Sequence, residues 1–102
     1  MKLLPSGTKD VFDIDIIAGY ILAEVFIYSF YYLANKVDTS GTLNATVVPW
    51  VNWNMVASVA TPLVLAFVTK GRIRKVMIYA FWFAFAMQLH YYLYASGTVK
   101  LI

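Results

Sequence analysis

The fold of this chain is decided by the stretch KGRIRK, residues 70–75, which separates two long apolar runs. It holds four of the eight Lys and Arg residues of the chain: Lys70, Arg72, Arg74 and Lys75. Because clustered cations are costly to move across a bilayer, basic loops remain on the cytoplasmic side. The stretch therefore predicts the cytoplasmic turn of a membrane hairpin, and these four cations set its topology.

The composition excludes an ordinary soluble domain. Of the 102 residues, 62% are hydrophobic, 18% are aromatic and only 13% are charged. The net charge of +3 does not indicate a nucleic-acid partner, because the cations gather at the expected membrane boundaries and no soluble face exists to carry them. The absence of cysteine excludes disulfides, thiolate metal sites, iron–sulfur clusters and covalently attached haem.

The apolar runs predict an all-α integral membrane protein with three transmembrane helices, forming one unit over residues 1–102. The spans are expected at about 14–34, 47–69 and 76–95, with the second and third as a tight hairpin around the basic loop 70–75. The N-terminus is then cytoplasmic and the C-terminus extracytoplasmic. Interfacial aromatic residues support this orientation, because eight of them gather at the opposite end: Tyr28, Tyr31, Tyr32, Trp50, Trp53, Tyr91, Tyr92 and Tyr94.

Acidic residues mark the first span. Asp10, Asp13 and Asp15 crowd its beginning, where carboxylates suit the positive end of a helix dipole, so capping and solvation are favoured over a functional cluster. Glu24 lies near the expected midplane, where an acid usually faces a partner or stays protonated. Tyr20 and Tyr28 lie one turn below and above it on the same stripe, which predicts a polar seam for helix packing.

The second span is expected to begin near Thr46, with Pro49 in its first turn, where a missing N–H costs little. Thr46 also completes the glycosylation sequon that begins at Asn44, although a helix-start role is favoured. Pro62 lies mid-span and predicts a kink. Asn54 lies a similar distance from its outer end as Gln88 does in the third span, so we expect a hydrogen bond between Asn54 and Gln88.

The third span also carries the only histidine, His90. Imidazole binds haem or copper, but one histidine makes no metal site by itself, and an interfacial histidine bonded to tyrosines or water is favoured. No nucleophile–base pair, paired-histidine motif or phosphate loop is present in the sequence. The chain therefore carries no recognisable catalytic constellation.

Three stretches resemble the small accessory (X) subunit of archaeal ammonia monooxygenase, a copper-dependent membrane enzyme: KDVFDIDI at 9–16, AGYILAE at 18–24 and PWVNWN at 49–54. The resemblance implies a non-catalytic subunit of an oligomeric complex in an archaeal cell membrane. It also implies that copper and substrate oxidation belong to larger partner subunits, with no cofactor in this chain.

The sequence therefore predicts a structural accessory subunit packed against larger integral membrane proteins within a hetero-oligomer. Two alternatives remain open. Glu24 is typical of the intramembrane acids of proton-coupled transporters, and His90 could anchor a haem in a redox complex if another chain supplied a second histidine.

Overall fold

The computed structural model describes residues 14–97, and these residues are mostly helical. Helix α1 (Ile14–Tyr32) continues directly into a π-helical turn, η1 (Leu33–Val37). A loop leads to a two-stranded antiparallel hairpin of β1 (Thr46–Val48) and β2 (Val51–Asn52), followed by α2 (Trp53–Val68) and α3 (Gly71–Ala95). Expectations for Asp10 and Asp13 lie outside the described residues.

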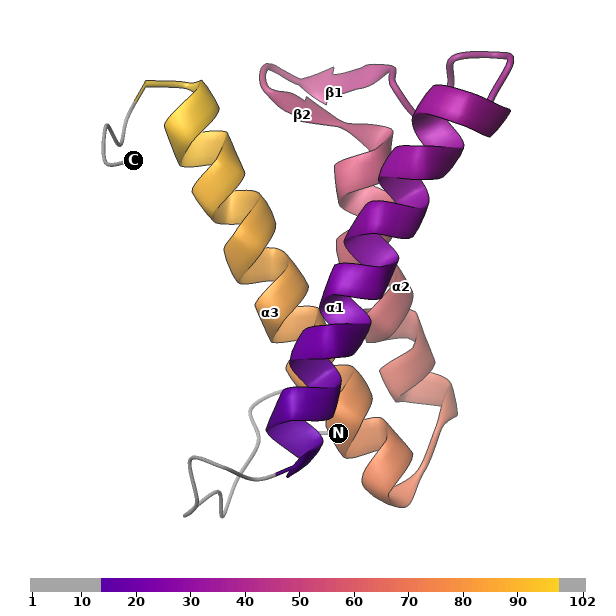
Figure 1. Ribbon diagram of the computed structural model, residues 1–102, viewed down its shortest axis with the longest axis vertical. Helices are drawn as coiled ribbons and strands as arrows, with labels where there is room; N and C mark the ends of the chain where they lie inside the picture. Colours follow the sequence, from indigo (N-terminus) through magenta and orange to yellow (C-terminus); the bar gives the residue numbers. More distant parts are fainter. Residues whose placement is uncertain (1–13, 98–102) are drawn as a thin grey trace.

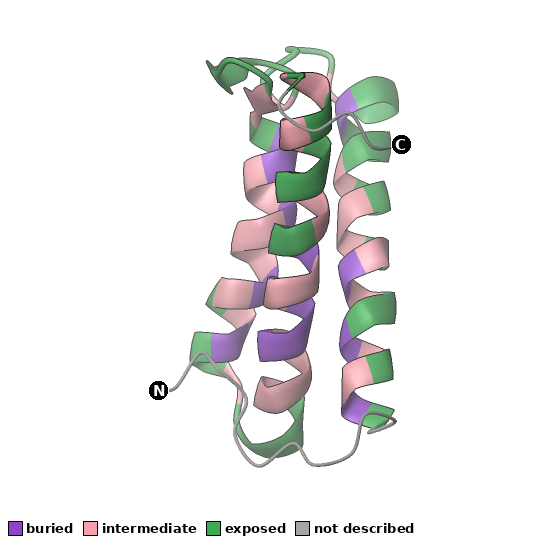
Figure 2. Cartoon of the chain, turned by 90° about the vertical axis from the view of Figure 1, so that its left-hand side faces the viewer, coloured by how far each residue is buried: buried purple, intermediate pink, exposed green. Residues whose placement is uncertain are grey.

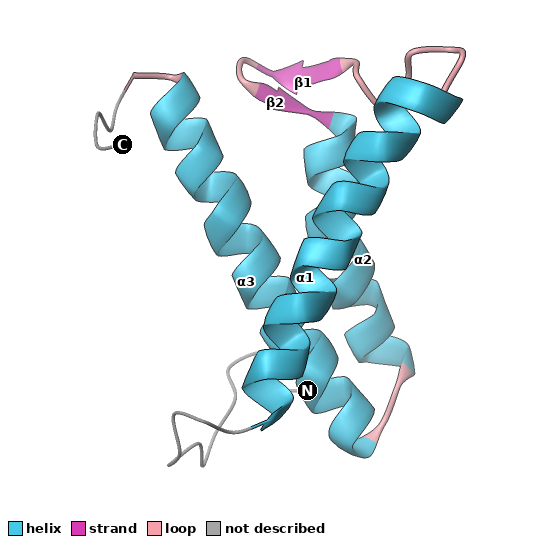
Figure 3. Cartoon of the chain, viewed as in Figure 1, coloured by secondary structure: helices cyan, strands magenta, loops and turns pink. Residues whose placement is uncertain are grey.

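The three helices form a bundle in which α3 packs against both α1 and α2 (Figure 1). One end, which we call the basic end, contains the start of α1 and the α2–α3 connection. The β-hairpin lies at the other, the hairpin end, where α3 leans away from α1 and α2 (Figures 1 and 3).

The α1–α3 crossing depends on small residues. A Cβ added to Gly19 would lie 2.4 Å from the Cβ of Tyr79, so this position accepts only glycine at the present helix separation. Ala23 on α1 and Ala80 and Ala84 on α3 are fully buried. Small side chains let helix backbones approach closely, and the small-residue spacing of Gly19 and Ala23 therefore serves packing inside the chain.

Bulky apolar side chains remain largely outside the bundle. Figure 2 shows buried positions where helices face one another and exposed positions on their outer sides and at the ends. Large exposed residues lie on every helix, among them Tyr28 and Ile21 of α1, Phe67 and Val68 of α2, and Leu89 and Tyr91 of α3. The bundle therefore has a small core and a predominantly apolar surface.

Two helical segments, Ile14–Val37 and Gly71–Ala95, are long and apolar enough to cross a membrane. The second expected span is shorter than predicted, because α2 begins at Trp53 and residues 46–52 form the hairpin. Thr46 therefore lies in a strand and Pro49 in the hairpin turn. The side chain of Asn52 accepts the Met55 N–H and caps α2 in place of Thr46.

The loop before the hairpin also stabilises the beginning of α2. The backbone N–H groups of Trp53 and Asn54 donate to the carbonyls of Ala45 and Leu43 at 3.1 and 2.9 Å. These bonds satisfy donors that the first turn of a helix leaves without partners. The folded-back loop thus fixes where α2 begins.

The basic stretch 70–75 is a helix beginning and not a loop. Helix α3 starts at Gly71 rather than at Val76, after a connection of Thr69 and Lys70. The φ of Gly71 is +64°, a conformation that glycine adopts without strain. Cations in a first helical turn are unfavourable to the helix dipole, and the contacts described below offset this cost.

Candidate functional site

A pocket whose lining includes several polar side chains lies between the three helices toward the hairpin end. Its volume is about 340 Å³. It is lined from α1, the folded-back loop, β2, α2 and α3 by Glu24, Ile27, Tyr28, Tyr31, Asn44, Asn52, Asn54, Met55, Met87, Gln88 and Tyr91. The pocket brings together four of the residues predicted to form the polar seam or to pair between helices, namely Glu24, Tyr28, Asn54 and Gln88.

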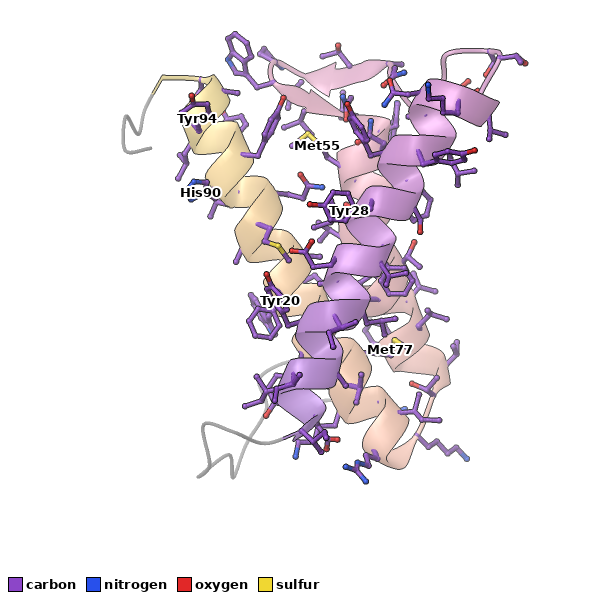
Figure 4. The ribbon with its side chains drawn as sticks, in the orientation of Figure 1. Tyr20, Tyr28, Met55, Met77, His90 and Tyr94 are labelled. Atoms are coloured by element: carbon purple, nitrogen blue, oxygen red, sulfur yellow. The ribbon has the colours of Figure 1, made fainter. Side chains whose placement is uncertain are left out.

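Glu24 is the only charged residue of the pocket lining. It is half-buried and forms no ion pair within residues 14–97. Tyr20 lies one turn below, close enough for its phenol to interact electrostatically with the Glu24 carboxylate. The Tyr20 ring packs edge-on against Phe83, with 5.5 Å between ring centroids, so Tyr20 belongs to the α1–α3 contact beneath the pocket. In Figure 4, Tyr28 projects toward the space between α1 and α3.

The expected hydrogen bond between Asn54 and Gln88 is not formed. Gln88 Nε2 instead donates to Ser58 Oγ at 3.0 Å, and Asn54 Nδ2 donates to Asn44 Oδ1 at 3.4 Å. The two amides have similar depths, but Ser58 lies one turn further along α2 and faces Gln88. The distance of each amide from the outer end of its helix therefore predicted that both lie in one polar layer, but it did not predict their hydrogen-bond partners.

Ser58 is the buried centre of this layer. Its side chain is fully buried, and its hydroxyl donates to the Met55 carbonyl at 2.8 Å while accepting from Gln88. Pro62 is also fully buried, one turn further toward the basic end. Because proline has no N–H, the carbonyl four residues earlier, that of Ser58, lacks its helical donor. The Ser58 hydroxyl does not replace this donor, because it donates to the Met55 carbonyl.

Asn44 connects the loop to the pocket. Its Nδ2 donates to the Ala34 carbonyl at 2.9 Å, while its Oδ1 accepts from Asn54. Both ends of the sequon amide thus take part in folding the loop back onto the helices. Sequence reasoning missed Asn44, Asn52, Met55 and Met87 as lining residues because only the folded-back loop and the helix rotation bring them together.

His90 lies outside the pocket. It is exposed, and Figure 4 shows it on the side of α3 that faces away from α1 and α2. Within the described part of the chain, no group of three or more His, Cys, Asp or Glu side chains could hold a metal ion. A haem bound at His90 would need its other contacts from another chain.

The cations of the basic stretch contact α1 and α2. Arg72 Nε lies 2.7 Å from Asp15 Oδ1, and Lys75 Nζ lies 3.4 Å from Asp15 Oδ2. Arg74 Nε donates to the Ala66 carbonyl in the last turn of α2 at 2.9 Å. Asp15 is buried, and its carboxylate joins α1 to α3 through these ion pairs. It is therefore not the solvated helix cap that was expected.

Comparison with known proteins gave no match among protein-family models, curated proteins or solved structures. Any functional assignment therefore depends on the residues and their geometry.

Proposed function

We propose that the chain is an integral membrane protein with three transmembrane helices, in which the hairpin end is extracytoplasmic. The N-terminus and the basic end are then cytoplasmic, because Lys70, Arg72, Arg74 and Lys75 gather at that end. Helix α2 has 16 residues, or about 24 Å at 1.5 Å per residue. The exposed Trp50 and Trp53 suit the membrane interface at its beginning.

The proposed role is that of a non-catalytic accessory subunit in a larger membrane enzyme complex. The observation that carries this proposal is the small core: the fully buried side chains are mostly small, while bulky apolar side chains cover the outside of all three helices. His90 is exposed on this apolar surface, and a polar side chain facing lipid is unfavourable unless a neighbouring helix satisfies it.

The resemblance to the accessory subunit of archaeal ammonia monooxygenase is compatible with this role. Under that proposal, the partners are larger integral membrane subunits, the complex is a hetero-oligomer in an archaeal cell membrane, and copper is bound by the partners.

Photo-crosslinking from the outer face of α3 tests the subunit role. A benzophenone amino acid at His90 should crosslink in native membranes to one larger integral membrane protein. The same group at Lys70, at the basic end, serves as the control for non-specific capture. Adducts with lipid alone, or equal capture of the same protein from both positions, would contradict a specific helix partner at His90.

A proton-coupled transporter is the second candidate, because Glu24 lines a pocket and has no cationic partner among the described residues. Intramembrane acids often serve proton or cation pathways. In proteoliposomes, Glu24→Gln should abolish proton-coupled uptake while His90→Gln leaves it unchanged. Uptake that survives Glu24→Gln would exclude this candidate.

A further inference from the structure

We propose that the pocket around Glu24 binds a primary ammonium group, carried either by a small free amine or by an aminophospholipid headgroup. The proposal depends on the pocket alone and goes beyond the subunit role. It holds whether the chain functions in a complex or by itself.

The charge of the pocket selects a cation. Among the described residues, no Lys, Arg or His lines it, and its one carboxylic acid is Glu24. An ionised carboxylate in a membrane usually pairs with a cation or a proton, and none of the described residues supplies a cation to Glu24. A bound cation would provide the missing partner.

The hydrogen-bonding atoms of the pocket favour a ligand with N–H donors. The amino groups of Asn54 and Gln88 donate to Asn44 and Ser58, and none of the described residues donates to Asn54 Oδ1 or Gln88 Oε1. No buried side-chain polar atom of the described residues lacks a hydrogen-bond partner, so these two oxygens are accessible rather than enclosed. With the Glu24 carboxylate they supply acceptors from three helices for the three N–H groups of an ammonium.

The remaining lining suits an alkyl ammonium better than a bare metal ion. Tyr28, Tyr31 and Tyr91 offer aromatic rings, which attract cations through their faces. Ile27, Met55 and Met87 provide apolar contacts for a short alkyl chain. A volume of about 340 Å³ lies within the usual range of small-molecule pockets, roughly 300–1,000 Å³, whereas an inorganic cation requires a tight shell of oxygen ligands.

Calorimetric titration of the full chain in phosphatidylcholine nanodiscs tests the proposal, with n-butylammonium as the probe. We expect saturable binding by n-butylammonium and none by n-butanol, the uncharged analogue. Glu24→Gln should weaken binding at least tenfold, because it keeps the shape of the side chain and removes its charge. His90→Gln, on the outer side of α3, should leave the affinity unchanged.

Two further arms keep the test decisive. Gln88→Glu adds a second carboxylate to the pocket and should tighten binding several-fold, which gives a result even if Glu24→Gln fails to fold. Nanodiscs containing phosphatidylethanolamine distinguish the source: competition with n-butylammonium supports a lipid headgroup, and undiminished binding supports a free amine. Absence of saturable binding, equal affinity in Glu24→Gln, equal binding of n-butanol, or equally effective competition by Na⁺ would overturn the proposal.

Discussion

Gly19 illustrates how a single residue sets the separation of two helices. A Cβ at this position would lie 2.4 Å from Tyr79 Cβ, 3.1 Å from Ala80 N and 3.2 Å from the Tyr79 carbonyl carbon. Two of these three atoms belong to the backbone, so rotation of a side chain cannot relieve the overlap. The α1–α3 crossing therefore depends on the absence of a side chain here.

Gly19→Ala is expected to destabilise the bundle by roughly 1–3 kcal/mol, the usual cost of overpacking a well-packed contact. The sign of the change in the free energy of unfolding is informative, because a glycine-to-alanine substitution in an uncrowded helix stabilises the helix by about 1 kcal/mol. Unfolding by SDS, followed by circular dichroism, measures the difference. A stabilised Gly19→Ala variant would show that α1 and α3 do not cross at this point.

Asp15 joins two helices through its contacts with Arg72 and Lys75. Its side chain is 9% exposed, whereas that of Arg72 is 70% exposed, so solvent screens part of the attraction. Asp15→Asn should therefore lower the free energy of unfolding by about 1–2 kcal/mol, measured by the same SDS titration. Asp15→Glu retains the charge and should lose less free energy of unfolding than Asp15→Asn does. A larger loss in Asp15→Glu than in Asp15→Asn would contradict a stabilising ion pair.

At the scale of elements, the loop from 38 to 45 connects η1 to the hairpin and determines where α2 begins. The Leu43 N–H donates to Asp38 Oδ2 at 2.6 Å, and the Ser40 hydroxyl donates to Asp38 Oδ1 at 2.7 Å. These bonds, with that from Leu43 the stronger, favour the ionised carboxylate and lower the pKa of Asp38 below its ordinary value.

The lowered pKa predicts how the loop responds to acid. Because the folded-state pKa lies below the unfolded one, the stabilisation is fully present above the ordinary carboxyl pKa and is lost as the pH falls through the lowered value. NMR titration in micelles should show the Leu43 amide shifting only in that acidic range. Asp38→Asn should abolish this pH-dependent shift. A shift of the Leu43 amide at or above the ordinary carboxyl pKa would refute the loop geometry, as would a shift that persists in Asp38→Asn.

Helices α2 and α3 are joined by the bond from Gln88 to the buried Ser58. Ser58→Ala should cost about 1 kcal/mol, in the range of hydrogen bonds between membrane helices. Ser29→Ala is the matched control, because Ser29 is exposed on α1 and its loss should be nearly neutral in SDS titration. Equal effects of the two variants would show that the Gln88–Ser58 bond does not stabilise the bundle.

The helices were predictable from the sequence, and several of their boundaries were not. Apolar length and the KGRIRK stretch predicted helices near the observed ones, but Val47, Val48 and Val51 fit a strand as well as a helix. Asn52, directly before the helix, was a recognisable capping signal. The contact of Arg72 with Asp15 joins residues 57 positions apart, a pairing that periodicity cannot predict.

The candidate site was predicted in part. The stripe of Tyr20, Glu24 and Tyr28 was predicted as a polar seam; Glu24 and Tyr28 line the pocket, whereas Tyr20 packs against Phe83. The contribution of Asn44 could not be predicted, because it depends on how the loop folds back. The helix rotation that aligns Gln88 with Ser58 rather than with Asn54 is set by packing and not by depth.

At the scale of the whole molecule, charge and aromatic residues predict one orientation in the membrane. The chain has no cysteine, so single cysteines can be introduced at the exposed Thr39 and Lys70. In intact cells, a membrane-impermeant maleimide should label Thr39→Cys and not Lys70→Cys. The reverse labelling pattern would invert the topology, and labelling of both positions would exclude the proposed spans.

In its proposed role, this bundle, with its small core and apolar surface, is completed by larger membrane subunits. The most direct measurement is native mass analysis of the affinity-tagged chain, extracted from its own membrane in a mild detergent. We expect a complex of fixed stoichiometry in which the chain is bound to larger integral membrane proteins. A stable lone monomer without co-purifying subunits would contradict it.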